Sequence, residues 1–316
     1  LKRQFEKMAS PKRSDKFKLF VLKSPQGFFA FVTYFKPMEN KFLNSTERLY
    51  DADINFMTTS RIDKEYVCMR NIPSIQNLKD KKIALVGCGS IGSFLADMLV
   101  KLGAGTGTGL ITIIDNDKFE AGNIGRHRLG YPSIEKSKAK ELRNEILRMM
   151  PANVVESMEK NAKGLTIQDL EQFDLIIDAT GEESIGNHLC SVLKEKALLS
   201  VWVEGNGVAV RGLLRTNVKQ ACYHCIRQYE MENRLLAVKS GGSLVLKGSC
   251  RSPYVTYPIT AAVQAACLGA DMVLNWANGK FEPSLRTRLI DSDSELGSSD
   301  CTPDPHHNCR LCNPCI

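Results

Sequence analysis

The 316-residue sequence is poor in aromatic side chains, which make up 7% of its residues and include only two tryptophans. It also lacks a basic segment followed by an apolar core at its start, so no signal peptide is expected. The longest apolar stretch, residues 259–276, contains Gln264, Asp271 and Asn275, which argues against a membrane span. We therefore expect a cytoplasmic location. Leucine rather than methionine occupies position 1, and we interpret the chain as a piece of a longer polypeptide.

The formal net charge of +7 comes mostly from the first 23 residues, which hold eight Lys and Arg against two acidic residues. A basic stretch with interleaved stacking aromatics would indicate nucleic-acid binding, but no such motif is present. We interpret the stretch as a solvated linker and expect no nucleic-acid partner. Hydrophobic residues make up 43% of the chain, which is enough for a sizeable core.

A glycine turn between an apolar run and a helical pattern organises the rest of the chain. Residues 83–86 predict a buried strand, and Gly87, Gly89 and Gly92 follow it with the spacing G-x-G-x-x-G. Without side chains at these positions, backbone N–H groups at a helix N-terminus approach phosphate oxygens closely. Ser90 lies within the same turn. The turn predicts a nucleotide ligand, although many such turns bind dinucleotides and some bind nothing.

The pattern around this turn predicts an α/β fold with a doubly wound, mostly parallel, Rossmann-like sheet. Expected strands at 83–86, 110–114 and 174–178 alternate with expected helices at 90–102 and 134–149. Residues 198–204 and an apolar run to Leu214 flank Gly205-Asn-Gly207, a hairpin signal that extends the sheet with antiparallel strands. Residues 258–276 predict a core or dimer-interface helix. The glycine-rich stretch 103–109 follows a helix and precedes a strand, so we interpret it as a turn.

Two regions are expected along the chain. Residues 1–60 are predicted to form a basic linker and a small β-hairpin appendage with strands at 17–22 and 28–35. Since an isolated hairpin is only marginally stable, we interpret this region as the end of a preceding domain. Residues 61–70 predict a short helix that leads into the nucleotide-binding domain, residues 61–316.

Polar and charged side chains follow the second predicted strand. Asp115 at its end is placed to bind both ribose hydroxyls, as in many dinucleotide folds, and Asp117 follows. Asn123 and Arg126 would bring an amide and a guanidinium over the glycine turn, where a triphosphate needs its charge neutralised. Lys138 opens the next helix, and its charge also suits phosphates. This set is unlike that of a dehydrogenase.

Five motifs in this order resemble the adenylation domain of the ThiF/MoeB and ubiquitin-activating enzyme family. They are Gly87-x-Gly89-x-x-Gly92, Asp115-x-Asp117, Asn123-x-x-Arg126, Lys138 thirteen residues before Pro151, and Asp178-Ala-Thr180. The resemblance runs from about residue 61 to the C-terminus. Residues 123–130, Asn-Ile-Gly-Arg-His-x-Leu-Gly, are similar to bacterial members fused to a ubiquitin-conjugating-like domain, including those of CBASS anti-phage operons.

The resemblance implies ATP as the nucleotide, with Asp115 on the ribose and the glycine turn on the phosphates. It implies that Arg126 and Lys138 are catalytic and neutralise the triphosphate. It also implies a homodimer in which an arginine is lent across the interface. Arg70 is the expected arginine, and Arg61 is the alternative.

One position departs from the family pattern. The family usually carries an acidic residue three positions after the first Asp of its Asp-x-Thr-Asp motif, where it binds magnesium, and Gly181 occupies that position here. Asp178 or Glu182 is therefore expected to bind Mg²⁺. An inactive nucleotide-binding scaffold stays open as an alternative.

The sequence has eleven cysteines and no secretory signal, which favours metal or thiol chemistry over disulfides. The pairs Cys222/Cys225 and Cys309/Cys312 have the spacing of a tetrahedral zinc site. The family resemblance also implies structural zinc, and a redox dithiol is the alternative. Other candidate ligands in the C-terminal segment are Cys315, His306 and His307.

Cys250 lies in a glycine-containing stretch, residues 239–253, with two basic residues nearby that favour its thiolate. The stretch resembles the crossover loop that carries the reactive cysteine in many family members. Cys250 is therefore the predicted nucleophile, with Cys301 as a second candidate. Cys190 and Cys267 fall on apolar helical patterns and are predicted to be buried in the core.

The resemblance implies ATP-dependent activation of a protein C-terminus. The terminal carboxylate would attack the α-phosphate of ATP, and the Cys250 thiolate would then displace AMP to form a thioester. Expected partners are a ubiquitin-like protein or a CD-NTase as substrate and a ubiquitin-conjugating-like domain, fused or separate. A sulfur-carrier adenylyltransferase without an obligatory thioester is the main alternative.

Overall fold

The computed structural model describes residues 15–24, 27–35, 52–62, 64–70, 72, 77–239, 246–247 and 254–312. It divides the chain into two compact units, residues 1–67 and 68–316. The sequence-based boundary near residue 60 and the origin of the first unit in a preceding domain stay predictions.

The first unit contains a three-stranded antiparallel sheet in the order β1-β2-β3. The predicted hairpin is present as β1 (Phe17–Ser24) and β2 (Gly27–Tyr34), with Phe20 paired with Phe31 and their rings stacked at 4.9 Å. The third strand, β3 (Asp53–Met57), was not predicted. Its five residues are all exposed, so hydrophobic periodicity gives no signal for it, and it is defined by its pairing with β2.

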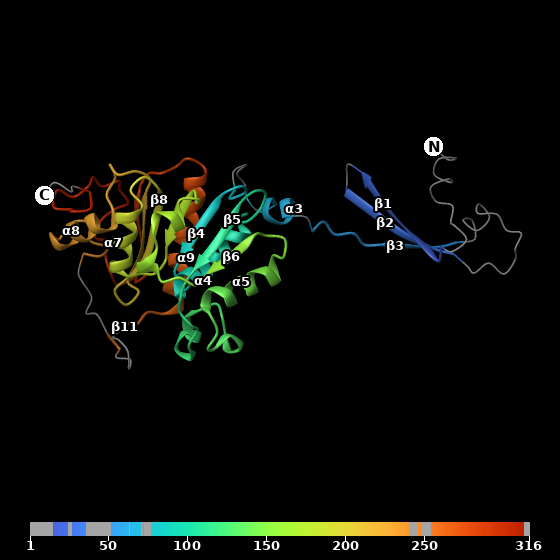
Figure 1. The fold of residues 1–316 in the computed structure, drawn as a ribbon, viewed down its shortest axis with the longest axis horizontal. Helices are drawn as coiled ribbons and strands as arrows, with labels where there is room; N and C mark the ends of the chain where they lie inside the picture. Colours follow the sequence, from blue (N-terminus) through green and yellow to red (C-terminus); the bar gives the residue numbers. More distant parts are fainter. Residues whose placement is uncertain are drawn as a thin grey trace, which may run out of the picture. The chain divides into compact units, whose positions relative to one another are not determined.

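The second unit is built on a seven-stranded sheet in the order β12-β9-β8-β7-β4-β5-β6. Strands β4 to β8 are parallel, and β9 and β12 continue the sheet in antiparallel pairs, which confirms the predicted fold class (Figure 1). Their bounds are β4 Lys82–Val86, β5 Leu110–Ile114, β6 Val155–Met158, β7 Leu175–Asp178, β8 Ala197–Glu204, β9 Ala209–Arg215 and β12 Leu285–Leu289.

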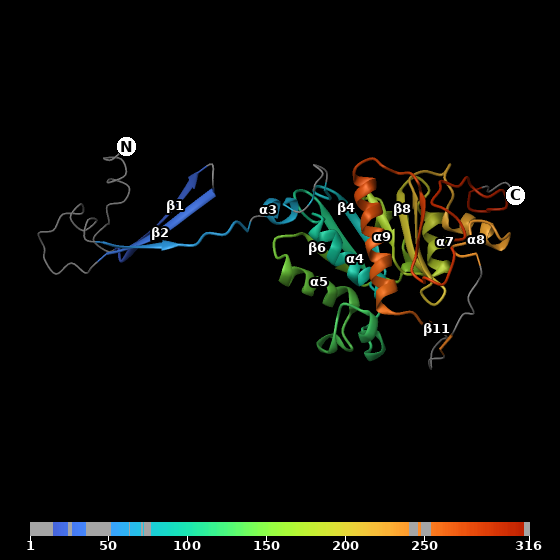
Figure 2. The same cartoon turned by 180° about the vertical axis from the view of Figure 1, so that it is seen from behind.

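Helices cover both faces of this sheet. Helices α4, α5 and α9 pack on one face, and α7 and α8 on the other (Figures 1 and 2). The helices within the second unit are α4 Ser90–Lys101, α5 Lys138–Met149, α6 Ile167–Leu170, α7 Glu183–Val192, α8 Tyr223–Met231 and α9 Ile259–Ala277, and α3 (Lys64–Met69) spans the division between the two units. Short 3-10 turns lie at Ala121–Arg126 (η1), Tyr131–Ser133 (η2) and Ala162–Gly164 (η3), and two-residue strands at Leu246–Lys247 (β10) and Tyr254–Val255 (β11).

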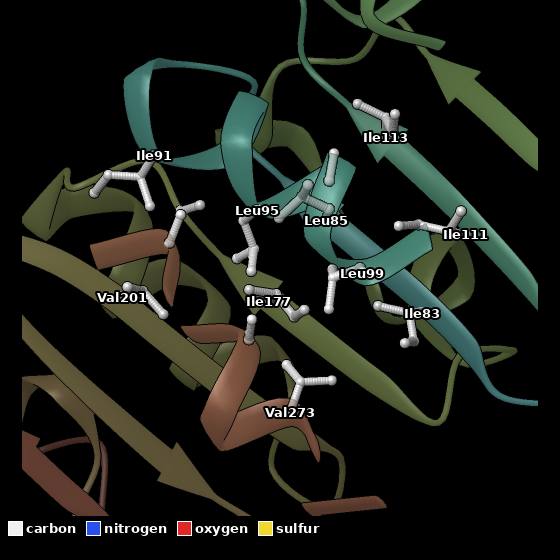
Figure 3. Close-up of a cluster of buried hydrophobic side chains, with 14 of the residues drawn as sticks. Ile83, Leu85, Ile91, Leu95, Leu99, Ile111, Ile113, Ile177, Val201 and Val273 are labelled. Carbon is white, nitrogen blue, oxygen red and sulfur yellow. The ribbon is translucent and has the colours of Figure 1, made fainter. Parts of the chain in front are cut away.

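The core lies on both sides of β4, which explains why this strand is apolar without alternation. Ile83 and Leu85 face the α4 side, whereas Ala84 and Val86 belong to the cluster on the α7 side. Figure 3 shows the first cluster, in which Leu85 lies among side chains of α4, β5, β7 and α9. Burial on both faces anchors the strand that carries the glycine turn.

Helix α9 packs against α4 with a stripe of small residues. A Cβ at Gly269 would lie 3.3 Å from Leu95, so glycine permits the close approach of the two helices. The prediction for Cys267 is wrong: its side chain is exposed, on the same helix face as Gln264 and Asp271. Positions three and four apart share a helix face, and the two polar neighbours were the signal for exposure. The predicted burial of Cys190 is confirmed.

Two further boundaries follow from local chemistry. Helix α5 begins at Lys138 rather than at residue 134, because the Ser137 side chain caps it by accepting a hydrogen bond from the Lys140 N–H. The stretch 103–109 forms the predicted turn, with positive φ at Gly103, Gly105 and Gly107.

Among the described residues, no helix has both the length and the apolar character needed to cross a membrane.

Candidate functional site

A cavity of about 790 Å³ opens at the point where the strand order reverses. The chain passes from β4 to β5 and β6 on one side and then returns to β7 on the other side of β4. Ligands of open α/β sheets bind at this switch point, outside the carboxyl ends of the strands. The cavity is lined there by Gly87 after β4, Asp115 after β5 and Thr180 after β7.

The three glycines of the turn have different structural roles. Gly87 has φ +92°, and a Cβ there would lie 2.8 Å from Thr180. A Cβ at Gly92 would lie 1.9 Å from the Gly87 carbonyl oxygen, so this position tolerates no side chain. A Cβ at Gly89 would meet no atom within 4 Å, and Gly89 lines the cavity. Gly87 and Gly92 therefore shape the turn, and Gly89 leaves room for a ligand beside the N-terminus of α4.

The carboxylate of Asp115 is held at both oxygens by the backbone. One oxygen accepts a hydrogen bond from the Cys88 N–H (2.7 Å) and the other from the Asp117 N–H (2.8 Å). Burial raises the pKa of Asp115 above its ordinary value, and these two hydrogen bonds oppose that shift. Asp115 thus ties the glycine turn to the end of β5 while it lines the cavity.

The two predicted cationic residues line the cavity and come from separate elements. Lys138, the first residue of α5, places its Nζ 2.9 Å from an Asp117 carboxylate oxygen, and its backbone N–H donates to the Asp117 carbonyl. Arg126 ends η1, where Asn123 accepts a hydrogen bond from the Glu120 N–H and closes a capping box. Asn123, Arg126 and Lys138 all line the cavity. The structure therefore brings these predicted residues around one space.

His127 holds the glycine turn through a hydrogen bond to the backbone of Cys88. Its Nδ1 accepts a hydrogen bond from the Leu129 N–H (2.9 Å), so the proton lies on Nε2, which donates to the Cys88 carbonyl oxygen. His127 is 6% exposed, and its ring packs edge-on against Phe119. Burial lowers the pKa of His127 to about 4, so the ring is neutral near pH 7.

This burial predicts acid sensitivity of the second unit. The unfolded chain takes up a proton on His127 below about pH 6.5, whereas the folded chain does so only near pH 4, so stability is lost as the pH falls through this window. The shift corresponds to a loss on the order of 3 kcal/mol in the free energy of unfolding. Urea unfolding followed by tryptophan fluorescence at pH 7 and pH 4.5 measures it, because Trp202 and Trp276 both lie in this unit. His127→Gln is expected to reduce the acid-induced loss.

His188→Gln is a matched control, since His188 faces the Leu165 carbonyl oxygen (2.8 Å) from α7. An equal acid-induced loss in the wild type and in His127→Gln would contradict this assignment.

The two candidate magnesium ligands occupy different positions. Asp178 is buried and is absent from the cavity lining; one of its oxygens accepts hydrogen bonds from the Thr180 N–H (3.0 Å) and Oγ1 (2.7 Å). Burial raises the pKa of Asp178 to about 6. Glu182, at the N-terminus of α7, is exposed and lines the cavity. The geometry therefore favours Glu182 for contact with a cation and Asp178 for shaping the turn.

Two other predicted residues, Arg70 and Arg61, are not among those that line the cavity. Arg70 is exposed on the turn after α3 and is not part of the cavity lining. Arg61 belongs to the first unit, where its guanidinium lies 5.1 Å from the Tyr66 ring centre. Cys250 lies outside the described residues, as does Cys315.

Sequence reasoning missed the residues that complete the cavity wall. They come from η3 and its N-cap, from the end of β8 and the turn after it, and from β11 and the segment before α9, and they include Asn161, Lys163, Val203, Gly205, Val255 and Tyr257. The Gly205-Asn-Gly207 hairpin signal marked one of these places as a turn but not as part of the site. The others carry no local signal, because only the sheet topology brings them to the switch point.

The four predicted zinc cysteines converge in the second unit. Cys222 Sγ lies 3.7 Å from Cys225 Sγ and 3.6 Å from Cys309 Sγ, and Cys225 Sγ lies 3.6 Å from Cys312 Sγ. Four thiolates at about 2.3 Å from one zinc ion would be separated by about this distance. Four converging sulfurs fit a tetrahedral zinc site, whereas a redox dithiol needs only two.

The other candidates in the C-terminal segment are used differently. His306 accepts a hydrogen bond from the Asn308 N–H at Nδ1 and faces a Glu232 carboxylate oxygen at 3.0 Å through Nε2, so both ring nitrogens are engaged. Cys301 lies outside the cluster and forms a backbone bridge with Leu285.

The fold and the cavity define the chain as a Rossmann-like α/β protein with a cavity at the switch point of its sheet and cationic side chains in the cavity wall. A model of the ThiF family matches residues 65–311, and the chain belongs to this family. This confirms the family expected from the sequence motifs.

Curated relatives carry names of related enzymes. The ATP-dependent ubiquitin transferase-like protein Cap2 of Pseudomonas aeruginosa is 39% identical over 93% of this chain and 55% of that protein, and Cap2 of Vibrio cholerae is 28% identical over 85% and 47%. The chain spans about half the length of these relatives. Molybdopterin-synthase adenylyltransferase of Salmonella typhimurium is 25% identical over 52% of this chain and 66% of that protein.

Solved structures share the fold. The crystal structure of Escherichia coli MccB with MccA-N7isoASN has a TM-score of 0.55 at 20% identity, covering 74% of this chain and 68% of that one. The MccB structure with ATP has a TM-score of 0.53 at 21% identity, covering 74% and 67%. At this identity the likeness establishes the fold and not the reaction.

Proposed function

We propose that this chain activates the C-terminus of a protein with ATP, first as an acyl-adenylate and then as a thioester on Cys250. The observation that carries the proposal is the convergence of the glycine turn, Asp115, Arg126 and Lys138 on one cavity. A carboxylate that can bind ribose and cationic side chains that can neutralise phosphate, brought together in one cavity, suit a nucleoside triphosphate.

The first step needs positioning and charge neutralisation rather than a general base. The substrate carboxylate is already ionised and attacks the α-phosphorus, so that one P–O bond forms and the bond to pyrophosphate breaks. Negative charge grows on the pyrophosphate as it leaves, and Arg126 and Lys138 would stabilise that charge. Turn amides at the start of α4 would bind phosphate oxygens, and Asp115 would orient the ribose.

The implied cations have separate roles. Mg²⁺ would compensate phosphate charge, with Glu182 as the candidate protein ligand lining the cavity. Zinc on the four cysteines would be structural, because all four positions are protein thiolates and none is open to substrate.

In the second step the Cys250 thiolate would attack the acyl carbon. A C–S bond would form, the bond to the AMP oxygen would break, and AMP would leave with that electron pair. The name of the Cap2 relatives, ATP-dependent ubiquitin transferase-like, supports such transfer chemistry. We propose as partners a ubiquitin-like protein or CD-NTase as substrate, a ubiquitin-conjugating-like domain as acceptor and a second copy of this chain that lends Arg70. A cytoplasmic antiviral conjugation system is the proposed setting.

A decisive test combines the chain with ATP, Mg²⁺ and the small protein or nucleotidyltransferase encoded beside it. We expect substrate-dependent ATP–pyrophosphate exchange and a thiol-sensitive adduct, seen by non-reducing gel and intact mass. Cys250→Ala is expected to abolish the adduct and retain exchange, whereas the control Cys301→Ala retains both. An adduct that persists in Cys250→Ala would overturn the assignment of the nucleophile.

The second candidate function is a sulfur-carrier adenylyltransferase, which would use the same nucleotide residues. The similarity to molybdopterin-synthase adenylyltransferase supports this second candidate. If the wild type and Cys250→Ala both catalyse pyrophosphate exchange and neither forms an adduct, the sulfur-carrier function is the correct one. ATP binding without exchange would instead select the inactive scaffold.

A further inference from the structure

Tyr257 occupies a distinctive place in the cavity wall. It lies between β11 and α9, and its hydroxyl is 2.6 Å from the Ser90 Oγ at the first position of α4. The guanidinium carbon of Arg126 lies 5.1 Å from the centre of its ring. Tyr257 thus contacts two other residues of the cavity wall, and it lines the cavity itself.

The backbone around Tyr257 is held from a second direction. The Asn206 side-chain amide, in the β8–β9 turn, donates a hydrogen bond to the Thr256 carbonyl oxygen (2.7 Å). A Cβ at Gly207 would lie 3.3 Å from the Tyr257 Cβ, so glycine lets this turn pack closely against the base of the Tyr257 side chain. Ser90 on one side and the β8–β9 turn on the other therefore fix the ring in place.

A fixed ring restricts where the Arg126 guanidinium can go. The face of an aromatic ring attracts a guanidinium within about 6 Å of its centre, and the attraction grows when water is excluded. Arginine has several rotatable bonds, so holding its head group before the ligand arrives reduces the entropy lost on binding. Pre-orientation of this kind favours a charge aimed at the leaving pyrophosphate.

A packing role alone does not account for these contacts. Tyr257 is only half-buried, and its ring faces a polar cavity rather than either hydrophobic cluster. Its hydroxyl is also directed at Ser90, at the helix N-terminus where phosphate is expected.

We propose that Tyr257 is a positioning residue that holds the Arg126 guanidinium toward the triphosphate. The inference rests on the proposed adenylation and adds a residue from the segment that follows the crossover stretch. In this role Tyr257 acts through Arg126.

A double-mutant cycle tests this role. Tyr257→Leu is expected to lower kcat for substrate-dependent pyrophosphate exchange about tenfold, as expected for the loss of a cation–π contact in a partly desolvated site. Tyr257→Phe keeps the ring and is expected to retain most of the activity. In an Arg126→Ala background, Tyr257→Leu is expected to change kcat less than twofold, because the group through which it acts is gone.

Tyr131→Leu serves as the matched control, since Tyr131 is 76% exposed and does not line the cavity. Circular dichroism and thermal melts confirm that each variant is folded. Equal losses from Tyr257→Leu in both backgrounds, or equal losses in Tyr257→Phe and Tyr257→Leu, would overturn the proposal.

The same cycle is measured on the Kd for Mg²⁺–ATP by calorimetry, which does not require turnover. Absence of exchange in the wild type would reject the proposed function, and the Kd cycle would still decide the role of Tyr257. A nonadditive effect on Kd supports positioning, whereas additive effects reject it.

Discussion

Replacing Lys138 by alanine is expected to slow substrate-dependent ATP–pyrophosphate exchange by about 100-fold or more. The Lys138 side chain is 11% exposed, and its ammonium lies in the cavity wall 2.9 Å from Asp117. A preorganised donor aimed at developing charge in a partly dry site typically contributes this much to kcat. Thermal unfolding of Lys138→Ala is expected to change little, because its partner Asp117 is 62% exposed and stays hydrated.

The position of Lys138 itself argues for this role. It is the first residue of α5, where the helix dipole disfavours a cation and favours an anion. Asp117 offsets part of that cost, but an exposed carboxylate is a weak compensation. The helix dipole thus makes this position unfavourable for a lysine. A more highly charged anion in the cavity would offset that cost and explain why a lysine is found there.

Lys140→Ala is the matched control for this prediction. Lys140 lies two residues further along α5, is 61% exposed, pairs with Glu159 and does not line the cavity. Its removal is expected to leave exchange within about twofold of the wild type. Similar rates for Lys138→Ala and the wild type would show that Lys138 does not act on the triphosphate.

The centre of the fold was predictable because its signals are local. The apolar run of β4, the glycine turn and the carboxylate after β5 each follow from chain order in a parallel sheet. The edge strands were not predicted. Strand β6 reads Val-Glu-Ser-Met and β12 reads Leu-Arg-Thr-Arg-Leu, and such short polar sequences become strands through pairing with β5 and β9.

The part of the candidate site that is local in sequence was also predictable. Asp115, Arg126 and Lys138 follow the switch point within a single βαβ region, so their spacing along the chain carried the information. Tyr257 lies 167 residues from Ser90, and only the tertiary fold brings them into contact. The pattern of cysteine pairs succeeded across 87 residues because metal-ligand spacing is itself a sequence signal.

Replacing Cys309 by serine is expected to release zinc and to lower the thermal midpoint of the second unit by on the order of 10 °C. Cys309 is fully buried, lies 3.6 Å from Cys222, and joins the C-terminal segment to α8 across the cluster. In small zinc domains, zinc binding contributes about 10–16 kcal/mol to the free energy of folding. Losing even part of that free energy destabilises a protein more than an ordinary core substitution does. About 4 kcal/mol would give the stated shift in a domain of this size.

The measurement is zinc content by mass spectrometry together with calorimetric melting. Cys301→Ser is the control, because Cys301 lies in the same C-terminal region but outside the four-sulfur cluster, and it is expected to keep one zinc per chain. Incubation of the wild type with a strong chelator is expected to reproduce the lowered midpoint of Cys309→Ser. Zinc bound at full occupancy in Cys309→Ser would show that the ion is held elsewhere. If both variants were instead zinc-free with unchanged melting, the four thiols would stabilise the fold by packing alone.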